Sequence, residues 1–229
     1  PDPGKPRAMV GGNLLTALRT AAASAVSIKH LARGDAKVLG MIGAGHQAAF
    51  QLRAALEQRG FEKVIGWNRD PTKLSTLATV AEEAGLPFET VTLDAMADAD
   101  VIVSITSSFD AILVAHQVSP GTHVACMGTD TRGKQEVDPV LLARATVFTD
   151  EVAQSTSIGE AQHAVAQGLI ADGDIRQLGA VINGTQPRRS STDEITLFDG
   201  TGVGLQDLAV AVAVVRLAVD EGVAIEVDF

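Results

Sequence analysis

Residues 37–48 read KVLGMIGAGHQA and carry the clearest structural signal in the chain. Residues 37–42 form a mostly apolar run, which predicts a buried strand of a parallel sheet. Gly43-Ala44-Gly45-His46-Gln47-Ala48 then fits the pattern G-x-G-x-x-A, in which the glycines allow a tight turn and a close approach of the backbone to a pyrophosphate. A helix predicted over residues 46–59 would present its first amides to that negative charge. An ordinary turn between a strand and a helix is the alternative interpretation.

The residues after this turn continue an alternation of strand and helix. Residues 63–67 predict a second strand, and Pro71 stands at the favoured first position of a helix that ends near Ala84. Further strands are predicted at residues 88–92, 101–105, 123–127 and 145–148. We therefore expect an α/β fold of Rossmann type, which is a doubly wound parallel sheet of about six strands with helices on both faces.

Further helices are predicted on both sides of this unit. Asn13 can cap a long helix over residues 14–30, and a shorter helix is predicted over residues 159–167. Residues 183–194 are polar and contain glycine, proline and serine, so they predict a surface connection. The last helix, over residues 205–221, consists almost entirely of alanine, valine and leucine. Such a helix must be buried in the protein or in an interface.

Composition excludes several classes of partner. The 18 Lys and Arg stand against 28 Asp and Glu, and the net charge of −10 would repel a nucleic-acid backbone. No uninterrupted apolar run reaches the ~18 residues of a membrane span, and residues 1–6 lack the apolar centre of a secretory signal. We therefore expect a cytoplasmic protein with no membrane partner. The single cysteine, Cys126, excludes an internal disulfide, and the histidines form no metal-binding pattern, so no metal site is predicted.

A second group of polar residues follows the strand predicted at residues 123–127. Residues 127–134 read MGTDTRGK. Ligands of open α/β sheets bind outside the carboxyl ends of the strands, so Asp130 is placed to meet one. Its carboxylate can donate or accept a proton at a nitrogen atom. The alternative is a loop aspartate whose side chain binds local amides.

The residues that would select the cofactor follow the second predicted strand. Asn68 can hydrogen-bond the adenosine ribose, and Arg69 can pair with a phosphate. Asp70 can instead help to begin the helix at Pro71. These residues leave NAD(H) and NADP(H) both open.

Four motifs together resemble the ornithine cyclodeaminase and mu-crystallin family. They are LTALRTAA at residues 15–22, GAGHQ at 43–47, GTD at 128–130 with GK at 133–134, and TLFDGTG at 196–202 before LQD at 205–207. The resemblance implies a homodimer with a Rossmann domain and a second domain for substrate binding and dimerisation. On the basis of this resemblance, we expect residues 1–12 to be a remnant of the second domain and residues 13–195 to form the Rossmann domain. We expect residues 196–229 to be a C-terminal segment that again belongs to the second domain.

The resemblance also implies roles for particular residues. Asp130 matches the acid or base of the family, and Asn68 takes the ribose-binding position. Gly200 and Thr201 stand where many members have serine and valine near the nicotinamide. We assign Thr201 to the substrate. The residues assigned to the cofactor are Arg19, Gly43, Gly45, His46, Gln47, Asn68, Arg69, Thr106, Met127, Lys134 and Gly200.

The activity implied by the resemblance is that of an imino acid reductase. Residues 11–29 and 197–209 are most similar to the branch of the family that reduces iminosuccinate to aspartate, which favours NAD(H) as the cofactor. Hydride would pass to the imine carbon while Asp130 donates or accepts the proton at the nitrogen atom. A cyclodeaminase and a mu-crystallin-like protein that binds a small ligand are the two alternatives.

The groups that bind the substrate carboxylate are expected outside these 229 residues. In the family an arginine and a lysine from an N-terminal domain fill this role, and this chain begins just before Gly11-Gly12-Asn13 at the start of the first long helix. Arg19 and Lys134 are the plausible cations near the cleft, and the resemblance assigns both to the cofactor. The apolar helix at residues 205–221 would then lack part of its packing partner.

Overall fold

The protein is built on one parallel sheet, as a computed structural model describes it for residue 4 and residues 6–227. The eight strands lie in the spatial order β3-β2-β1-β4-β5-β8-β6-β7. The first six positions of this order follow the Rossmann arrangement, with β8 as the sixth strand. The strands are β1 (Val38–Ile42), β2 (Lys63–Trp67), β3 (Phe88–Thr90), β4 (Val101–Ser104), β5 (His123–Cys126), β6 (Thr146–Thr149), β7 (Arg176–Gln177) and β8 (Thr196–Asp199).

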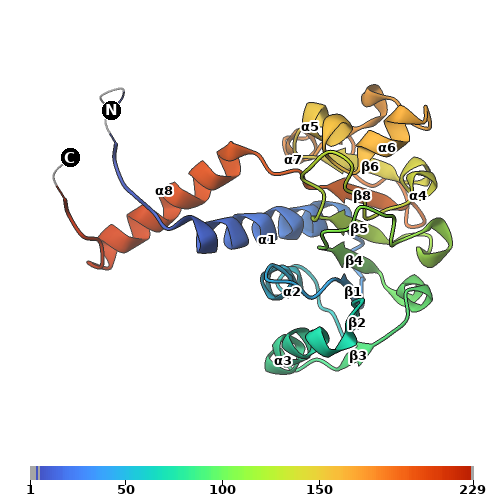
Figure 1. Ribbon diagram of the computed structural model, residues 1–229, viewed down its shortest axis with the longest axis horizontal. Coiled ribbons are helices and arrows are strands. Elements are labelled where there is room, and N and C mark those ends of the chain that lie inside the picture. The colour runs from blue at the N-terminus through green and yellow to red at the C-terminus, as the bar shows by residue number, and fades with distance from the viewer. Residues whose placement is uncertain (1–3, 5, 228–229) are drawn as a thin grey trace.

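Helices cover both faces of this sheet. In Figure 1, α1, α2 and α3 lie on one side of the strands, and α4 and α6 lie on the other. The α-helices are α1 (Gly12–Leu31), α2 (Ala48–Leu56), α3 (Ser75–Glu83), α4 (Pro139–Arg144), α5 (Val152–Ser157), α6 (Ala161–Ala166), α7 (Leu178–Ile182) and α8 (Gly204–Asp220). Short 3-10 helices are η1 (Pro71–Leu74), η2 (Asp94–Asp98), η3 (Ala115–Gln117) and η4 (Asp172–Asp174).

The core consists of two apolar layers, one on each face of the sheet. Successive side chains of a strand point to opposite faces, so Leu39 and Met41 of β1 pack with α1 and α2 while Ile42 packs in the opposite layer. Cys126 is fully buried in that second layer. Burial raises the pKa of its thiol.

The six strands predicted from the sequence are confirmed, and the structure adds β7 and β8. All four residues of β8 are buried, and the strand pairs with β5 on one side and with β6 on the other. The boundary predicted between residues 195 and 196 is therefore too early, because Thr196–Asp199 is an interior strand of the Rossmann sheet. Residues 1–12, predicted as a remnant of a second domain, lie partly outside the described residues, and residues 6–11 have no regular secondary structure.

The first long helix begins earlier than the sequence indicated. Asn13 was expected to cap it, but α1 starts at Gly12, and the residue at the cap position is Gly11, which offers no side-chain hydrogen bond. The helix ends at Leu31, one residue beyond the predicted end at residue 30. Arg59, which lies shortly after α2, donates hydrogen bonds to the carbonyl oxygens of Ile28 and Ala32 and so satisfies the last turn of α1.

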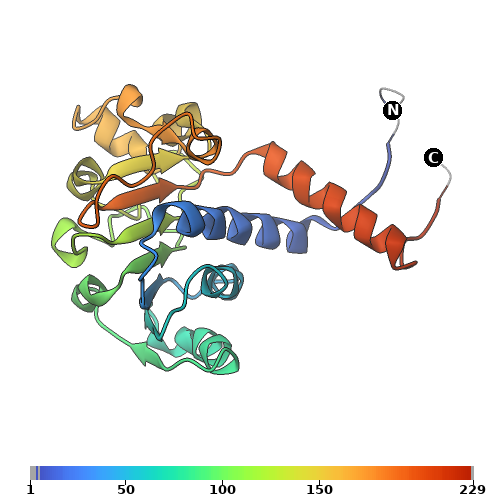
Figure 2. The same ribbon diagram turned by 180° about the vertical axis from the view of Figure 1, so that it is seen from behind.

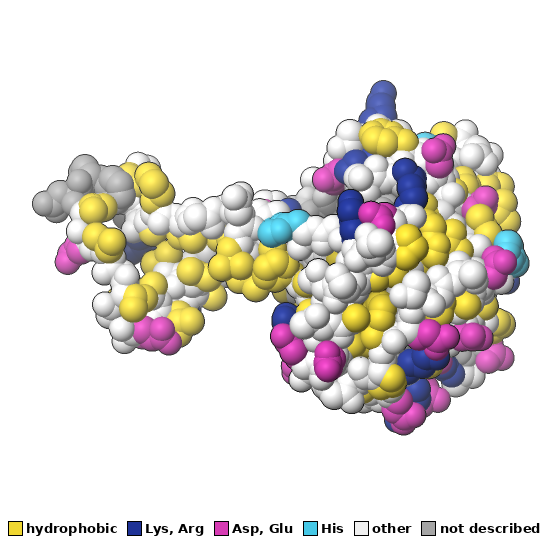
Figure 3. Space-filling view, turned by 60° about the horizontal axis from the view of Figure 1, so that its bottom comes forward, with side chains coloured by type: hydrophobic (Ala, Val, Ile, Leu, Met, Phe, Trp, Pro, Cys, Tyr) yellow, Lys and Arg dark blue, Asp and Glu magenta, His cyan; other side chains and the backbone are white. Residues whose placement is uncertain are grey.

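Helix α8 extends away from the sheet and is not buried within this chain, which leaves an interface as the remaining alternative of the sequence prediction. Figures 1 and 2 show it crossing beside α1 and continuing outward. None of its described residues is buried, and the side chains of Leu205 and Val219 are 72% and 61% exposed. Figure 3 shows hydrophobic side chains gathered along this projecting part. Among the described helices, none has the length and apolar character needed to cross a membrane.

Candidate functional site

A cavity of about 620 Å³ opens at the carboxyl ends of β1, β2, β4, β5 and β8. It lies at the point where β1 has β2 on one side and β4 on the other, which is where open α/β sheets bind ligands. Every site residue predicted from the sequence lines this cavity. These residues are Arg19, Gly43, Gly45, His46, Gln47, Asn68, Arg69, Thr106, Met127, Asp130, Lys134, Gly200 and Thr201.

The two glycines of the turn after β1 have different surroundings. Gly43 has a φ of 100°, and a Cβ atom there would lie 2.4 Å from the carbonyl oxygen of Ile105. This position therefore requires glycine for the fold itself. Around the Cβ position of Gly45 no heavy atom of the described chain lies within 4 Å. The backbone at Gly45 thus leaves open space on the cavity wall, which suits the close approach of a pyrophosphate.

Gln47 adds a second feature that fits a bound dinucleotide. Its Oε1 atom is buried and has no hydrogen-bond partner among the described residues. Helix α2 begins directly afterwards, at Ala48, two residues later than predicted. A buried acceptor without a partner normally costs free energy, so a ligand donor in this cavity would satisfy it. The residues present therefore fit a dinucleotide at this turn.

Asp70 follows the end of β2 and lines the cavity, and one of its carboxylate oxygens is engaged within the chain. Asp70 caps η1, since its Oδ1 accepts hydrogen bonds from the Thr72 amide at 3.1 Å and from the Thr72 hydroxyl at 2.6 Å. These hydrogen bonds lower the pKa of Asp70. The role of starting the helix at Pro71 is therefore confirmed. Asn68 and Arg69 line the cavity together with Asp70 and Lys73. Lys73 was not predicted as a site residue, because it lies within η1 and belongs to none of the motifs.

Asp130 and Lys134 form an ion pair on the cavity wall. The Nζ atom of Lys134 lies 2.7 Å from Oδ1 of Asp130 and 3.3 Å from the carbonyl oxygen of Gly128. Partial burial favours the neutral acid, but the hydrogen bond and the charge of Lys134 outweigh it and lower the pKa of Asp130. Asp130 is therefore a carboxylate near neutral pH, able to accept a proton or to stabilise a positive charge at a nitrogen atom.

Arg19 connects the cavity to the start of α8. Its Nε atom lies 3.3 Å from Oδ1 of Asp207, and its guanidinium packs against Gly202, where a Cβ atom would lie 2.6 Å from Nη1. Gly202 has a φ of 80°, so both the backbone angle and this contact favour glycine. The predicted cofactor contact is thus held in place by the first turn of α8.

Gly200 and Thr201 depart from the residues that many members of the family carry, and their surroundings differ from each other. A Cβ atom at Gly200 would lie 2.6 Å from the side chain of Met127, so Met127 takes the space of a larger residue. The hydroxyl of Thr201, the predicted substrate contact, donates to Oδ1 of Asp150 at 2.6 Å. That hydroxyl is therefore already engaged within the protein.

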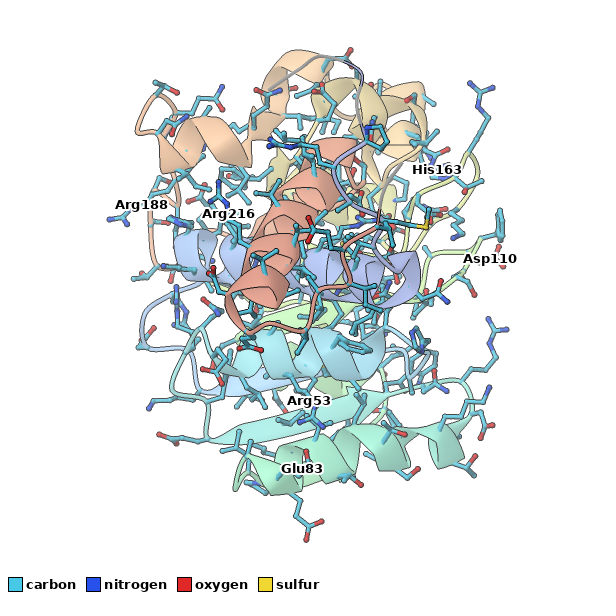
Figure 4. All side chains as sticks on the ribbon, turned by 90° about the vertical axis from the view of Figure 1, so that its left-hand side faces the viewer. Arg53, Glu83, Asp110, His163, Arg188 and Arg216 are labelled. Atoms are coloured by element: carbon cyan, nitrogen blue, oxygen red, sulfur yellow. The ribbon has the colours of Figure 1, made fainter. Side chains whose placement is uncertain are left out.

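The described residues contain no group of His, Cys, Asp and Glu side chains arranged to hold a metal ion. Glu160 and His163, three residues apart, do not pair with each other. Instead, Nε2 of His163 lies 3.0 Å from the carbonyl oxygen of Lys134, behind the loop that carries Asp130. Figure 4 shows His163 and Asp110 on the same edge of the molecule, with Arg188 on the opposite edge.

The strand order, the glycine turn and the cavity are those of a Rossmann-type dinucleotide-binding protein. The sequence profile of the ornithine cyclodeaminase/mu-crystallin family matches residues 1–222. The chain belongs to this family, as its four motifs indicated.

Several relatives share both the sequence and the fold. The iminosuccinate reductase of Paracoccus denitrificans is 66% identical over 229 residues, which are all of this chain and 71% of that protein. Its crystal structure in complex with NAD+ superimposes with a TM-score of 0.97. An archaeal alanine dehydrogenase dimer with bound NAD is 34% identical with a TM-score of 0.96, over 100% of this chain and 72% of that one. The Δ1-pyrroline-2-carboxylate reductase of Thermococcus litoralis, in complex with NADH and L-proline, is 29% identical with a TM-score of 0.94, over 99% of this chain and 72% of that one.

Proposed function

We propose that this protein is an NAD(H)-dependent imino acid reductase that converts iminosuccinate to aspartate. The observation that carries the proposal is the Asp130 carboxylate, held by Lys134 on the wall of the cavity that also contains the glycine turn. Reduction of an imine requires a bound dinucleotide and, beside it, a carboxylate that can exchange a proton with the imine nitrogen. Iminosuccinate is favoured as the substrate by the 66% identity with the Paracoccus reductase.

The residues of this chain have distinct tasks in such a reaction. A bound nicotinamide supplies hydride to the imine carbon. Asp130, as a carboxylate, accepts a hydrogen bond from the protonated imine nitrogen and stabilises its positive charge, which makes the carbon a better hydride acceptor. Lys134 keeps Asp130 ionised and fixes the direction of its Oδ1 atom. After reduction, the same carboxylate exchanges protons with the amine.

Different parts of the cavity are proposed to bind different parts of the cofactor. We assign the pyrophosphate to the turn at Gly45, a hydrogen-bond donor of the cofactor to Oε1 of Gln47, the adenosine ribose to Asn68, and the nicotinamide side to Thr106 and Met127. All of these residues line the cavity. The assignment of His46, Arg69, Lys134 and Gly200 to the cofactor and of Thr201 to the substrate remains a prediction. NAD(H) is favoured over NADP(H) because related structures hold NAD+ and NADH.

We further propose a homodimer in which the second copy covers α8, so that this helix belongs to a dimerisation region separate from the Rossmann sheet. Exposed leucine and valine side chains along α8, such as Leu208 and Leu217, supply the apolar surface. A related archaeal alanine dehydrogenase forms a dimer. Sedimentation that gave the mass of a monomer at micromolar concentration would contradict this assembly. A cytoplasmic location also remains a prediction.

The function is tested by following NADH in the presence of different imines. Oxaloacetate with ammonia supplies iminosuccinate, pyruvate with ammonia supplies the imine of alanine, and Δ1-pyrroline-2-carboxylate is a cyclic imine. We expect NADH consumption with stoichiometric aspartate, and the highest kcat/KM for iminosuccinate. Ammonia release from ornithine without net change in NADH would identify a cyclodeaminase instead. Ligand binding without any turnover would identify a binding protein.

A further inference from the structure

A buried carboxylate, Glu136, joins the ends of two neighbouring strands behind the cavity wall. Its side chain is fully buried. Its Oε1 atom accepts hydrogen bonds from the Ser104 hydroxyl and from the Thr106 amide, both at 2.6 Å. Its Oε2 atom accepts a hydrogen bond from the Gly128 amide at 2.8 Å. Ser104 ends β4 and Gly128 follows β5, so one carboxylate holds both of the segments that continue into the cavity wall.

These two segments need such an acceptor because the sheet no longer pairs them. The register of β4 with β5 ends at Ser104 and Cys126, and buried amides beyond that point must find other partners. The backbones are also unusually close, since a Cβ atom at Gly128 would lie 2.1 Å from the carbonyl oxygen of Thr106. Glu136 satisfies both amides from one position.

A second buried acid fixes Glu136 itself. Oε1 of Glu160 accepts hydrogen bonds from the Glu136 amide at 2.7 Å and from the Thr129 hydroxyl, and its Oε2 accepts one from the Val137 amide at 3.1 Å. Both ends of the loop that carries Asp130 are therefore held. Burial raises the pKa of each glutamate, and the charge of Glu136 raises the pKa of Glu160 further. The three hydrogen bonds that Glu136 accepts oppose the rise in its pKa and favour its carboxylate form.

We propose that Glu136 is a positioning residue for the nicotinamide half of the cofactor site, acting through the amides of Thr106 and Gly128. The inference rests on the proposed use of NAD(H). A dinucleotide that crosses the point between β1 and β4 places its adenosine half over β2 and its nicotinamide half over β4 and β5. Thr106 and Gly128 line the cavity on the nicotinamide side, and Asn68 lines it on the adenosine side. Glu136 therefore influences one half of the ligand and leaves the other half unaffected.

The variant Glu136→Gln changes this arrangement at a single atom. The carboxamide keeps the volume of the side chain but replaces one acceptor oxygen with an NH2 donor. If the NH2 group takes the position of Oε2, it faces the Gly128 amide. If it takes the position of Oε1, it faces the Thr106 amide. In either orientation one amide of the cavity wall loses its acceptor and must move or remain unsatisfied.

The test compares two ligands by calorimetric titration. NADH contains both halves, whereas ADP-ribose lacks the nicotinamide. We expect Glu136→Gln to weaken NADH binding about tenfold, the effect of one lost buried hydrogen bond, and to leave the Kd of ADP-ribose unchanged within about twofold. Glu194→Gln is the matched control, because Glu194 also accepts hydrogen bonds from a hydroxyl, that of Thr146, and from a backbone amide, that of Ser190. It does not line the cavity, and neither affinity should change.

The outcomes separate this inference from the proposed function. Equal weakening of NADH and ADP-ribose, or no weakening of either, overturns the positioning role while leaving the reductase intact. Failure of the unaltered protein to bind NADH overturns both. Should Glu136→Gln fail to fold, Ser104→Ala removes one donor from the same carboxylate and must shift the ratio of the two affinities in the same direction, by about threefold. An unchanged ratio in Ser104→Ala also overturns the inference.

Discussion

Replacing Gly43 with alanine should destabilise the fold by an amount that the structure allows us to estimate. The residue has a φ of 100°, a region that costs a residue with a side chain about 1–2 kcal/mol. The new Cβ atom would also lie 2.4 Å from the carbonyl oxygen of Ile105 and 3.0 Å from Cγ2 of Thr106. Relief of such overlap in a packed region costs about 1–3 kcal/mol. We expect the free energy of unfolding to fall by about 2–5 kcal/mol.

Gly45→Ala is the matched comparison, two residues further along the same turn. The φ angle of Gly45 is not positive, and no heavy atom of the described chain lies within 4 Å of its Cβ position. Alanine should therefore leave the free energy of unfolding unchanged or raise it by up to about 1 kcal/mol, because the unfolded chain loses freedom. Its methyl group would occupy the open space at the cavity wall, so the affinity for NADH should fall about tenfold or more.

Urea unfolding without ligand and calorimetric titration with NADH measure the two effects separately. The two variants should differ in opposite ways: Gly43→Ala should be unstable, and Gly45→Ala should be stable but should bind NADH weakly. Parental NADH affinity in Gly45→Ala would refute the assignment of this turn to the pyrophosphate. Parental stability in Gly43→Ala would refute the steric argument from Ile105.

Three other predictions concern chemistry and pH. Asp130→Asn should lower turnover by roughly 10² or more with little change in NADH affinity, and near-normal turnover would make Asp130 an ordinary loop residue. NADH should bind more tightly than NADPH by a modest margin despite Arg69, and a tenfold preference for NADPH, about 1.4 kcal/mol, would contradict this. Burial raises the pKa of Asp199 from 3.8 to about 7, so the native state holds a proton that the unfolded state releases, and stability falls as pH rises from about 4 to 7. Asp199→Asn should remove up to about 4 kcal/mol of this fall, and identical unfolding profiles across that range would show that Asp199 does not titrate there.

The sequence predicts the six strands of the sheet that carry their own local signals, β1 to β6. The apolar run before Gly43 and the spacing to the next strand are sufficient for β1, α2 and β2, because strand, turn and helix each have a characteristic pattern. Strand β8 has no such signal. Its residues, Thr196–Asp199, directly follow a polar stretch and end in a carboxylate, and they form a strand because β5 and β6 pair with them from both sides. Tertiary contacts decide such elements.

In the candidate site, too, some residues can be recognised from local sequence motifs, whereas others can be recognised only from contacts made in the fold. Asp130 was identified because it follows a strand directly, and Gly45 because it belongs to a short motif. Glu136 has no comparable pattern, since an acidic residue in a polar loop usually faces water. Only the fold reveals that this glutamate is fully buried between the ends of β4 and β5. Its importance depends on which amides lack partners, and that is a property of the assembled sheet.

The contacts of Arg19 link the orientation of α8 to the ligand cavity. Arg19 lines the cavity, and it also pairs with Asp207 in the first turn of α8. A partner surface that fixes the orientation of α8 therefore also fixes the guanidinium of Arg19 at the cavity wall. Thermodynamic linkage makes the relation reciprocal, since a ligand that favours this position of Arg19 favours the same direction of α8 to an equal extent. Assembly and ligand binding would then be cooperative, with each event raising the equilibrium constant of the other.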